Sequence, residues 1–330
     1  MKVVHFIRKR RQFSNYSIEG FYKNIRFELA NEIEIETIEC PYESNGIFRR
    51  LSNSIYAAFK QSDINHITGD VNYLNLFFRK SKNIVTILDC GTLQRLTGIK
   101  HFIVKIIWYT FPIKKAKYIV AISQATKDEI LKYVNCDPDK IKVIYVSVSP
   151  IYKRTEKEFN KHKPSILHIG TASNKNLSRL IKAITGLNCK LVIIGKLNNA
   201  YIKELNENEI DYENFVDVSD EEVFEQYKAC DILAFVSTYE GFGMPIIEAN
   251  TIGRPVITSN LLSMPEVAGD AALIVDPYNI DEIRSGIIKI INDDNCRNDL
   301  IEKGFNNAKR FNLEKIANEY LELYNRVNSE

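Results

Sequence analysis

The sequence offers little that would place the chain in a membrane or in an oxidising compartment. No uninterrupted apolar run reaches the roughly 18 residues that suggest a membrane-spanning helix. The apolar start at residues 3–7 is too short for a signal peptide, and the basic run Arg8-Lys9-Arg10-Arg11 lies on its wrong side. The 6 cysteines include no CxxC pair and no short His–Cys spacing, which disfavours a zinc site and a disulfide framework. We therefore expect a cytoplasmic protein.

Motifs for metals and dinucleotide cofactors are also missing. Gly241-Phe242-Gly243 supplies two glycines of a dinucleotide-binding fingerprint, but the third is absent and the segment lies far from the first strand. Asp137-Pro138-Asp139 has the form of a DxD metal motif, yet Asp and Pro favour turns, so we interpret this segment as a turn. We predict neither a metal nor a cofactor.

Charge is present in an ordinary amount but is divided unevenly. Charged residues make up 26% of the chain and hydrophobic residues 45%, as in a globular protein. Residues 1–150 carry 23 Lys/Arg against 14 Asp/Glu, a net of +9, whereas residues 151–330 carry 21 against 28, a net of −7. A length of 330 residues suits two domains, and the opposite signs suggest that the two have different partners.

Short apolar runs alternate with helical patterns through the whole chain. The strands predicted in the first half are residues 3–7, 33–38, 65–67, 84–88, 118–122 and 143–146, with helices at 17–30, 48–60 and 126–133. In the second half the strands are 166–169, 191–194, 232–235, 256–258 and 273–275, with helices at 177–185, 220–229, 245–252 and 280–292. Strands that alternate with helices predict parallel, doubly wound α/β sheets.

A polar, aperiodic segment marks the boundary between the two domains. Residues 152–164 are charged and show no periodic pattern, so we interpret them as a surface linker between domains of residues 1–150 and 165–312. Asn312 is a good N-cap, and the apolar residues after it fall on one helix face. This pattern predicts a last helix over residues 313–330.

The segment Ser237–Ala249 carries the clearest chemical signal. A buried strand is expected to end near Ser237, and Pro245 fits the first turn of the next helix, where a missing N–H costs nothing. Glycines in the loop between them let a ligand approach the backbone, and the free N–H groups of a helix start favour an anion. Glu240 in the loop and Glu248 about one turn into the helix can then face one crevice at the end of the sheet. Phosphate at the helix start and hydroxyls at the carboxylates describe a nucleotide sugar.

A plainer alternative stays open for an isolated pair of glutamates. Glu240 can be a loop charge and Glu248 can lie on a solvated helix face, since carboxylates are mostly exposed in folded proteins.

Several segments together resemble one protein family. Glu-Gly-Phe-Gly-Met-Pro-Ile-Ile-Glu-Ala, starting at Glu240, resembles the signature of family-4 retaining glycosyltransferases of GT-B fold, the "glycosyl transferases group 1" type. The further similar segments are His168–Leu177, Leu191–Gly195, Gly253–Ile257, Val275–Pro277 and, in the first half, Asn65–Gly69, Val85–Asp89 and Ile122–Thr126. The similarity extends over nearly the whole chain, and its specific part is the C-terminal half.

The resemblance implies a set of donor-binding residues. Glu248 would bind the ribose hydroxyls, Glu240 would hold hydroxyls of the donor sugar, and Lys175 would hold the diphosphate and stabilise the leaving group. Backbone contacts would come from Phe242 and Gly243. The other candidates at the donor are Met244, Gly170, Thr171, Asn174 and Gly195.

The chain departs from the family pattern at two places. Family members often carry a basic residue just after the glycine turn or an Arg before Lys-Asn, where this chain has Thr171 and Asn174. Phosphate binding would therefore depend more on Lys175 and the helix amides. Many relatives have His before the Asp of the N-domain turn, where this chain has Leu88-Asp89. Asp89 is thus a catalytic candidate on the acceptor side.

The resemblance also implies the fold and the reaction. We expect two Rossmann-like domains facing each other across a cleft, with the C-terminal helix packing back on the first domain. Residues 1–150 would bind the acceptor and residues 165–312 the donor. The expected reaction is retaining transfer from a UDP- or GDP-linked sugar to a glycan or lipid-linked glycan in surface polysaccharide synthesis. Other GT-B chemistry, such as that of an epimerase or a phosphorylase, and a non-catalytic donor-binding subunit are the alternatives.

The segment Arg95–Lys117 suggests where the acceptor is met. It interleaves basic residues with large apolar ones, which suits a helix lying on an anionic membrane surface. A buried helix whose lysines extend to solvent explains the same pattern equally well. No nucleic-acid-binding motif is present, so we expect no nucleic-acid partner.

Overall fold

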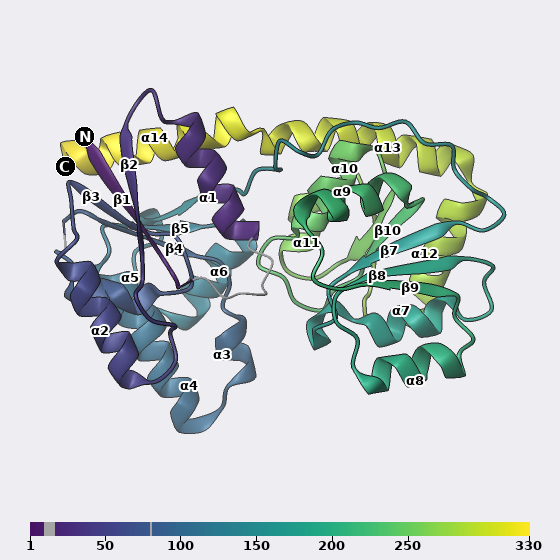
Figure 1. Ribbon diagram of the computed structural model, residues 1–330, viewed down its shortest axis with the longest axis horizontal. Helices are drawn as coiled ribbons and strands as arrows, with labels where there is room; N and C mark the ends of the chain where they lie inside the picture. The colour runs from purple at the N-terminus through teal and green to yellow at the C-terminus, as the bar shows by residue number, and fades with distance from the viewer. Residues whose placement is uncertain (10–16, 80) are drawn as a thin grey trace. The chain divides into compact units, whose positions relative to one another are not determined.

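The computed structural model describes residues 1–9, 17–79 and 81–330, which divide into two units (Figure 1). The first unit comprises Met1–Ser147 together with Asn312–Glu330, and the second comprises Val148–Phe311. Arg10 and Arg11 of the basic run lie outside the described residues.

A parallel sheet forms the centre of the first unit, with its strands in the order β2-β1-β3-β4-β5-β6. The strands are β1 Lys2–Ile7, β2 Glu34–Glu39, β3 Ile64–Ile67, β4 Asn83–Ile87, β5 Tyr118–Ala121 and β6 Ile141–Val143. The central strands are buried along their length, because helices cover both faces of a parallel sheet, whereas the edge strand β2 is partly exposed. Residues 144–146 follow β6 as non-strand backbone, so the expected strand at 143–146 is displaced toward the N-terminus.

The helices of the first unit largely follow the expected positions. They are α1 Ser17–Glu28, α2 Ile47–Ala58, α3 Gly91–Arg95, α4 Gly98–Val104, α5 Phe111–Lys115, α6 Gln124–Tyr133 and α14 Leu313–Ser329, with 3₁₀ turns η1 Asn72–Phe77 and η3 Pro138–Lys140 and a π-helical turn η2 Lys105–Thr110. At η3 the Asp137 carboxylate accepts a hydrogen bond from Asp139 N (2.9 Å). The DxD-like segment is therefore a turn, as predicted.

The C-terminal helix α14 packs on the first unit through a buried polar network. The Tyr324 hydroxyl lies 2.8 Å from His5 Nε2 and 2.9 Å from His66 Nδ1. The remaining contacts join Tyr22 to Thr86 (2.6 Å) and to Tyr320 (3.0 Å), and His66 to Thr86 (2.8 Å). These residues come from α1, β1, β3, β4 and α14, so the last helix completes a core that the first strands begin. The expected packing of this helix on the first domain is confirmed.

The second unit has a parallel sheet of order β12-β11-β10-β7-β8-β9. Its strands are β7 Ser165–Ile169, β8 Lys190–Ile194, β9 Tyr212–Phe215, β10 Ile232–Phe235, β11 Val256–Ser259 and β12 Leu273–Val275. Its helices are α7 Leu177–Ile184, α8 Asn199–Glu207, α9 Asp220–Ala229, α10 Met244–Ile252, α11 Ser263–Ala268, α12 Ile280–Asn292 and α13 Asp294–Ala308, with 3₁₀ turns η4 Ser173–Lys175 and η5 Lys309–Phe311. The two sheets with their helices are the two Rossmann-like α/β domains that the sequence predicts.

The segment at residues 152–163 has neither helix nor strand, but it packs on the second unit. The buried Asp231 carboxylate pairs with Lys157 and accepts from Asn160 N (3.1 Å). Phe159 packs against the core of this unit, and the Arg297 guanidinium lies 4.0 Å from its ring centroid. This stretch is thus an ordered part of the second unit.

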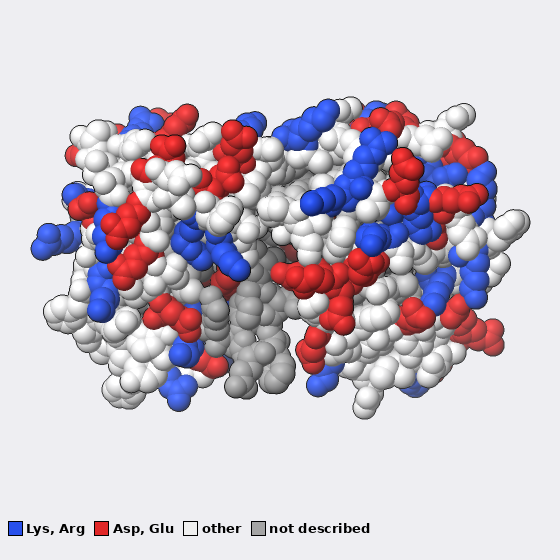
Figure 2. Space-filling view, turned by 45° about the horizontal axis from the view of Figure 1, so that its top comes forward, with Lys and Arg blue, Asp and Glu red and all other residues white. Residues whose placement is uncertain are grey.

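Charges of both signs are mixed on the second unit. Figure 2 shows acidic and basic side chains next to one another over its visible face. Exposed ion pairs such as Lys190–Glu213 (2.6 Å) and Lys303–Asp299 (2.7 Å) account for part of this mixture. Across residues 1–9, 17–79 and 81–330, no helix is both long enough and apolar enough to cross a membrane.

Candidate functional site

The loop between β10 and α10 is held in one shape by its backbone. Gly243 has a φ of 111°, in the left-handed region that favours glycine, and it immediately precedes the first residue of α10. Pro245 occupies the first turn, as predicted. From the following helix, the Ser263 Oγ lies 2.9 Å from the carbonyl oxygen of Glu240 and 2.7 Å from that of Phe242. The loop therefore presents Glu240 from a backbone that a second helix supports.

A second loop, after β7, meets this one. Thr238 N donates to the Asn174 carbonyl oxygen (2.8 Å), and the Asn174 side chain donates to the Tyr239 carbonyl oxygen (2.9 Å). Asn176 has a φ of 65° and donates to the carbonyl oxygens of Val236 (3.0 Å) and Pro277 (2.7 Å). Asn174 therefore has a structural task, because its backbone and its side chain join the two loops.

The loop contact brings a lysine and a glutamate together. Lys175 Nζ lies 2.6 Å from Glu240 Oε1, and both side chains are largely buried. The same ammonium lies 5.0 Å from the centroid of the Phe235 ring. Glu240 is thus an ion-paired side chain, which excludes the alternative of a free loop charge.

Two glycines make room for this arrangement. Gly170 has a φ of 93°, and a Cβ there would lie 2.9 Å from Lys175 Cγ. Gly195 has a φ of 134°, and a Cβ there would lie 3.1 Å from Thr171 Cγ2. The Thr171 hydroxyl donates to the Lys196 carbonyl oxygen (2.7 Å), which joins the turns after β7 and β8. Side chains at either glycine would displace the loop that carries Lys175.

Glu248 lies on α10 in a different environment. It is buried, with 9% of its surface exposed, and the Tyr227 hydroxyl donates to its Oε2 (2.6 Å). The pKa of Glu248 is raised to about 7, chiefly by burial and also by Asp220, although Tyr227, Tyr152 and Lys175 lower it. The alternative of a solvated helix face is therefore wrong.

Three residues that support this site could not be predicted from the sequence. Tyr227 lies in the last turn of a helix that was predicted, but nothing in its spacing marks it as a partner of Glu248. Tyr152 lies in the polar segment interpreted as a linker. Ser263 follows β11 without any motif. Arg254, from the family-like segment Gly253–Ile257, does contact this part of α9. Its guanidinium donates to the carbonyl oxygens of Tyr227 (3.1 Å) and Lys228 (2.9 Å) and so holds the end of α9 in place.

Asp89 belongs to the first unit, whereas the other predicted site residues belong to the second. Its carboxylate accepts from Gly91 N (2.8 Å) at the start of α3, and the Tyr109 hydroxyl donates to its carbonyl oxygen (3.2 Å). Asp89 thus supports the turn that starts α3.

Two further features bear on the chemistry. No group of three or more His, Cys, Asp and Glu side chains that could hold a metal ion occurs within residues 1–9, 17–79 and 81–330.

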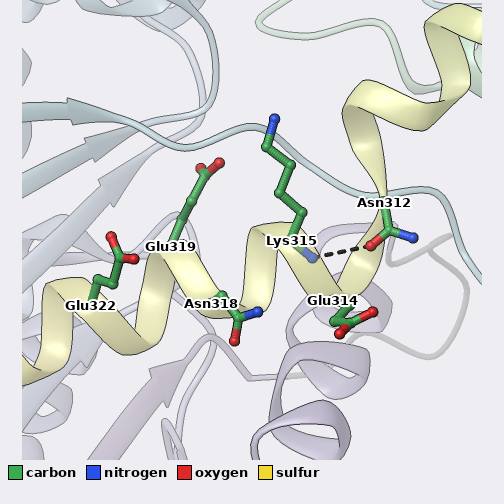
Figure 3. Close-up of a pocket in the computed structure, with 6 residues that line it drawn as sticks. All are labelled: Asn312, Glu314, Lys315, Asn318, Glu319 and Glu322. Carbon is green, nitrogen blue, oxygen red and sulfur yellow. Dashed lines mark hydrogen bonds between the residues drawn. The ribbon is translucent and has the colours of Figure 1, made fainter.

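Figure 3 shows a surface pocket on α14 of the first unit, lined by Asn312, Glu314, Lys315, Asn318, Glu319 and Glu322. This pocket holds three carboxylates against one lysine and none of the predicted donor residues, so it does not suit a diphosphate.

The second unit therefore brings together one ammonium, one ion-paired carboxylate, one buried carboxyl group and the N-terminus of a helix. The ammonium and the helix N–H groups can hold an anion, and the carboxylates can accept hydrogen bonds from hydroxyls.

Known proteins are similar to this chain in sequence and in fold. The family model "Glycosyl transferases group 1" matches residues 152–307. O-antigen chain mannosyltransferase B of Escherichia coli is 31% identical over 232 residues, which are 63% of this chain and 60% of that protein. A Campylobacter jejuni N-acetylgalactosamine-N,N'-diacetylbacillosaminyl-diphospho-undecaprenol 4-alpha-N-acetylgalactosaminyltransferase is 26% identical over 76% of this chain and 72% of its own.

The chain matches between about half and three fifths of the length of the first curated relatives. Among solved structures, Anabaena Alr3699/HepE in complex with UDP and glucose has a TM-score of 0.78 at 16% identity, covering 99% of this chain and 100% of that one. This likeness shows the two-domain GT-B fold. The match to the glycosyl transferases group 1 rests on the second unit, since the family model covers residues 152–307.

Proposed function

We propose that the protein is a retaining, metal-independent glycosyltransferase that transfers a sugar from a nucleotide-sugar donor. The observation that carries this proposal is the Lys175–Glu240 pair at the meeting of two loops, with the buried Glu248 on the helix that follows. A diphosphate needs a cation, a sugar needs hydroxyl acceptors, and a ribose needs a second acceptor. The second unit supplies one residue for each.

Each residue has one task in this proposal. The Lys175 ammonium binds the diphosphate and stabilises the charge that grows on it as the bond to the sugar breaks. Glu240, released from Lys175 when the diphosphate enters, accepts hydrogen bonds from the sugar hydroxyls. Glu248 accepts from the ribose hydroxyls, and Tyr227 holds its carboxylate in position.

The transfer step exchanges one bond at the anomeric carbon for another. The bond from this carbon to the phosphate oxygen breaks, and the bond to the acceptor oxygen forms on the same face of the sugar. The proton of the acceptor hydroxyl passes to the departing phosphate oxygen, so no protein base is needed. This proton path is compatible with Leu88 at the position where many relatives carry His.

The donor carries UDP or GDP in this proposal, and the acceptor is a glycan or a lipid-linked glycan. One structural neighbour binds UDP and glucose, the E. coli relative is named an O-antigen chain mannosyltransferase, and the Campylobacter relative is named for a diphospho-undecaprenol substrate. Asp89 in the first unit is the proposed acceptor-side residue. We also propose that the protein works in the cytoplasm at the inner membrane face, which the basic and apolar segment Arg95–Lys117 supports.

A thermal-shift screen over UDP-, GDP-, ADP- and dTDP-sugars tests the donor. A ligand at 100 times its Kd should stabilise the protein by about 2.7 kcal/mol. Product analysis with and without acceptor then separates transfer from epimerisation or phosphorolysis. A protein that no nucleotide sugar stabilises would contradict the proposed function.

A further inference from the structure

Helix α2 exposes large apolar side chains and buries small or polar ones, which is the opposite of an ordinary surface helix. The side chains that it buries are Asn53, Ser54 and Ala57. The large side chains that it exposes are Ile47, Phe48, Leu51, Ile55 and Tyr56, and Phe59 follows directly after the helix. Phe48 is 86% exposed and Phe59 is 84% exposed. A contiguous exposed apolar face of this kind marks an interaction site in a folded protein.

The reversal is fixed by specific hydrogen bonds. The Asn53 side chain donates to the Tyr42 carbonyl oxygen (2.8 Å) and to the Tyr73 hydroxyl (3.1 Å), and it accepts from Tyr42 N (3.1 Å). A rotation of the helix that buried its apolar side chains would break all three. The outward direction of the apolar face is therefore specified by the fold.

A second apolar segment lies beside α2 at the same end of the first unit (Figure 1). None of the residues of α4 is buried. The exposed large side chains of α4, η2 and the start of α5 are Ile99, Phe102, Ile103, Ile107 and Phe111. The Arg50 guanidinium of α2 lies 4.4 Å from the centroid of the Trp108 ring in η2, which joins the two segments. We name the exposed residues of α2, Phe59 and this second segment the apolar platform.

The chain segments that form the apolar platform carry charge of one sign. Residues 44–62 contain no Asp or Glu, and neither do residues 90–127. The cations of the platform include Arg49 and Lys60 at α2 and Lys100 in α4, all exposed. Not every basic residue of Arg95–Lys117 is free, since Lys115 donates to the Leu76 carbonyl oxygen and Lys117 pairs with Glu330 (2.7 Å).

This charge decides what can cover the platform. A symmetric contact between two copies would place the same basic face against itself, which like charges disfavour. An anionic lipid bilayer instead offers acyl chains to the apolar side chains and negative headgroups to the cations around them.

We propose that the apolar platform docks on an anionic lipid bilayer, with Phe48 and Phe59 of the α2 region entering the acyl-chain boundary. The inference extends the proposed membrane contact from Arg95–Lys117 to α2. It rests on the proposed function only in naming the bilayer as the place of the acceptor. A binding test is independent of transfer, so a protein that bound vesicles but no nucleotide sugar would contradict the proposed function alone.

The single tryptophan makes the test direct, because Trp108 lies within the region of the platform. The full chain is mixed with vesicles of phosphatidylcholine alone or of equal parts phosphatidylcholine and phosphatidylglycerol, and sedimented at low and high salt. We expect binding to the second vesicles only, release as salt rises, and quenching of Trp108 fluorescence when the lipids carry brominated acyl chains.

Paired variants identify the surface. Phe48→Gln with Phe59→Gln should weaken vesicle binding by about 100-fold, roughly ten-fold for each ring withdrawn from the lipid. Phe27→Gln on α1 is the matched control, since Phe27 is 82% exposed but lies outside the platform, and it should bind as the parent does. Arg49→Gln with Lys100→Gln should lose about 25-fold, or five-fold per cation, whereas Lys23→Gln on α1 should lose little.

Three outcomes overturn the proposal. The first is a parent protein that fails to sediment with anionic vesicles at low salt. The second is a Phe48→Gln/Phe59→Gln variant that melts normally and binds as well as Phe27→Gln. The third is a parent dimer, measured by sedimentation equilibrium, that this variant abolishes while vesicle binding is absent, because a second copy would then be the occupant.

Discussion

The two glutamates of Ser237–Ala249 stand eight positions apart, yet their surroundings are opposite. Glu240 lies in a loop and pairs with the ammonium of Lys175, so its charge is balanced by a neighbour. Glu248 lies on a helix and contacts the neutral hydroxyl of Tyr227, and burial raises its pKa to about 7. One signature thus builds an ion-paired region around Glu240 and a region around Glu248 whose charge depends on pH near 7. We therefore expect sugar binding at Glu240 and ribose binding at Glu248 to respond differently to mutation, and a change of pH near 7 to act through Glu248.

The largest expected effect separates the two regions by kinetics. Glu240→Ala should lower kcat by about 100-fold or more while the donor KM changes only a few-fold, because the lost contact stabilises the sugar as its bond breaks. Steady-state kinetics with a nucleotide sugar and an acceptor measure both constants. Glu207→Ala, on the exposed face of α8, is the control and should retain both. A Glu240→Ala enzyme with unchanged constants would refute the assignment.

Glu248→Ala should give the complementary result. Loss of a charged acceptor for the ribose hydroxyls should raise the donor KM by about 10- to 150-fold, the range for a hydrogen bond of 1.5–3 kcal/mol, with a smaller change in kcat. The Kd of the free nucleotide, measured by calorimetry, should rise with it, whereas Glu240→Ala should leave that Kd nearly constant. Equal nucleotide affinity in both variants would remove the distinction between the two regions.

A pH titration sharpens the comparison further. Below about pH 7 Glu248 becomes protonated and is a poorer acceptor, so the donor KM should rise as pH falls through 7. Tyr227→Phe removes a hydrogen bond that favours the ionised form, so it should move this rise to higher pH. Tyr201→Phe, a tyrosine on α8, is the control. A profile that Tyr227→Phe leaves in place would show that the titrating group is not Glu248.

The same carboxyl group should make the protein less stable as pH rises, which is opposite to its effect on donor binding. The folded-state pKa of Glu248 lies above its ordinary value of 4.5, so the folded protein binds more protons than the unfolded chain between pH 4.5 and about 7. The contribution of Glu248 to stability is therefore present below pH 4.5 and is lost as pH rises toward 7. Urea unfolding of the parent and of Glu248→Gln should show this difference in slope, since Gln does not titrate.

The smallest expected effect is that of a chelator. EDTA should leave transfer unchanged, because Lys175 supplies the positive charge at the diphosphate in the proposed site. Turnover that EDTA removed and Mg²⁺ or Mn²⁺ restored would contradict this prediction.

The sequence predicted the parallel α/β units because their buried strands are short apolar runs and the segments between them show helical patterns. Strand β10 and helices α9 and α12 match the predicted residues. Strand β9 was missed because Tyr212–Phe215 is a half-exposed edge strand with polar residues. Helix α13 was missed because part of its buried face is polar, with Arg297 and Asn307 turned inward.

The motif identified the two glutamates but not what holds them. Lys175 and Glu240 are 65 positions apart, and their contact exists because Asn174 and Asn176 join two loops across the sheet edge. Tyr227 reaches Glu248 from a different helix. Such contacts depend on tertiary packing, which local spacing does not encode. The reversed faces of α2 were equally hidden, since a helical period shows that one face is apolar but not which way it points.

The place of α14 in the first unit sets an order of events during synthesis. The ribosome delivers Met1–Ser147 long before Tyr320 and Tyr324, which close over His5 and His66. Until Tyr324 has been synthesised, both histidines lack its hydroxyl, and the nascent first unit cannot reach its final packing. The second unit, in contrast, emerges as one unbroken stretch and can fold as soon as it leaves the exit tunnel. The half that is translated first is thus the half that is completed last.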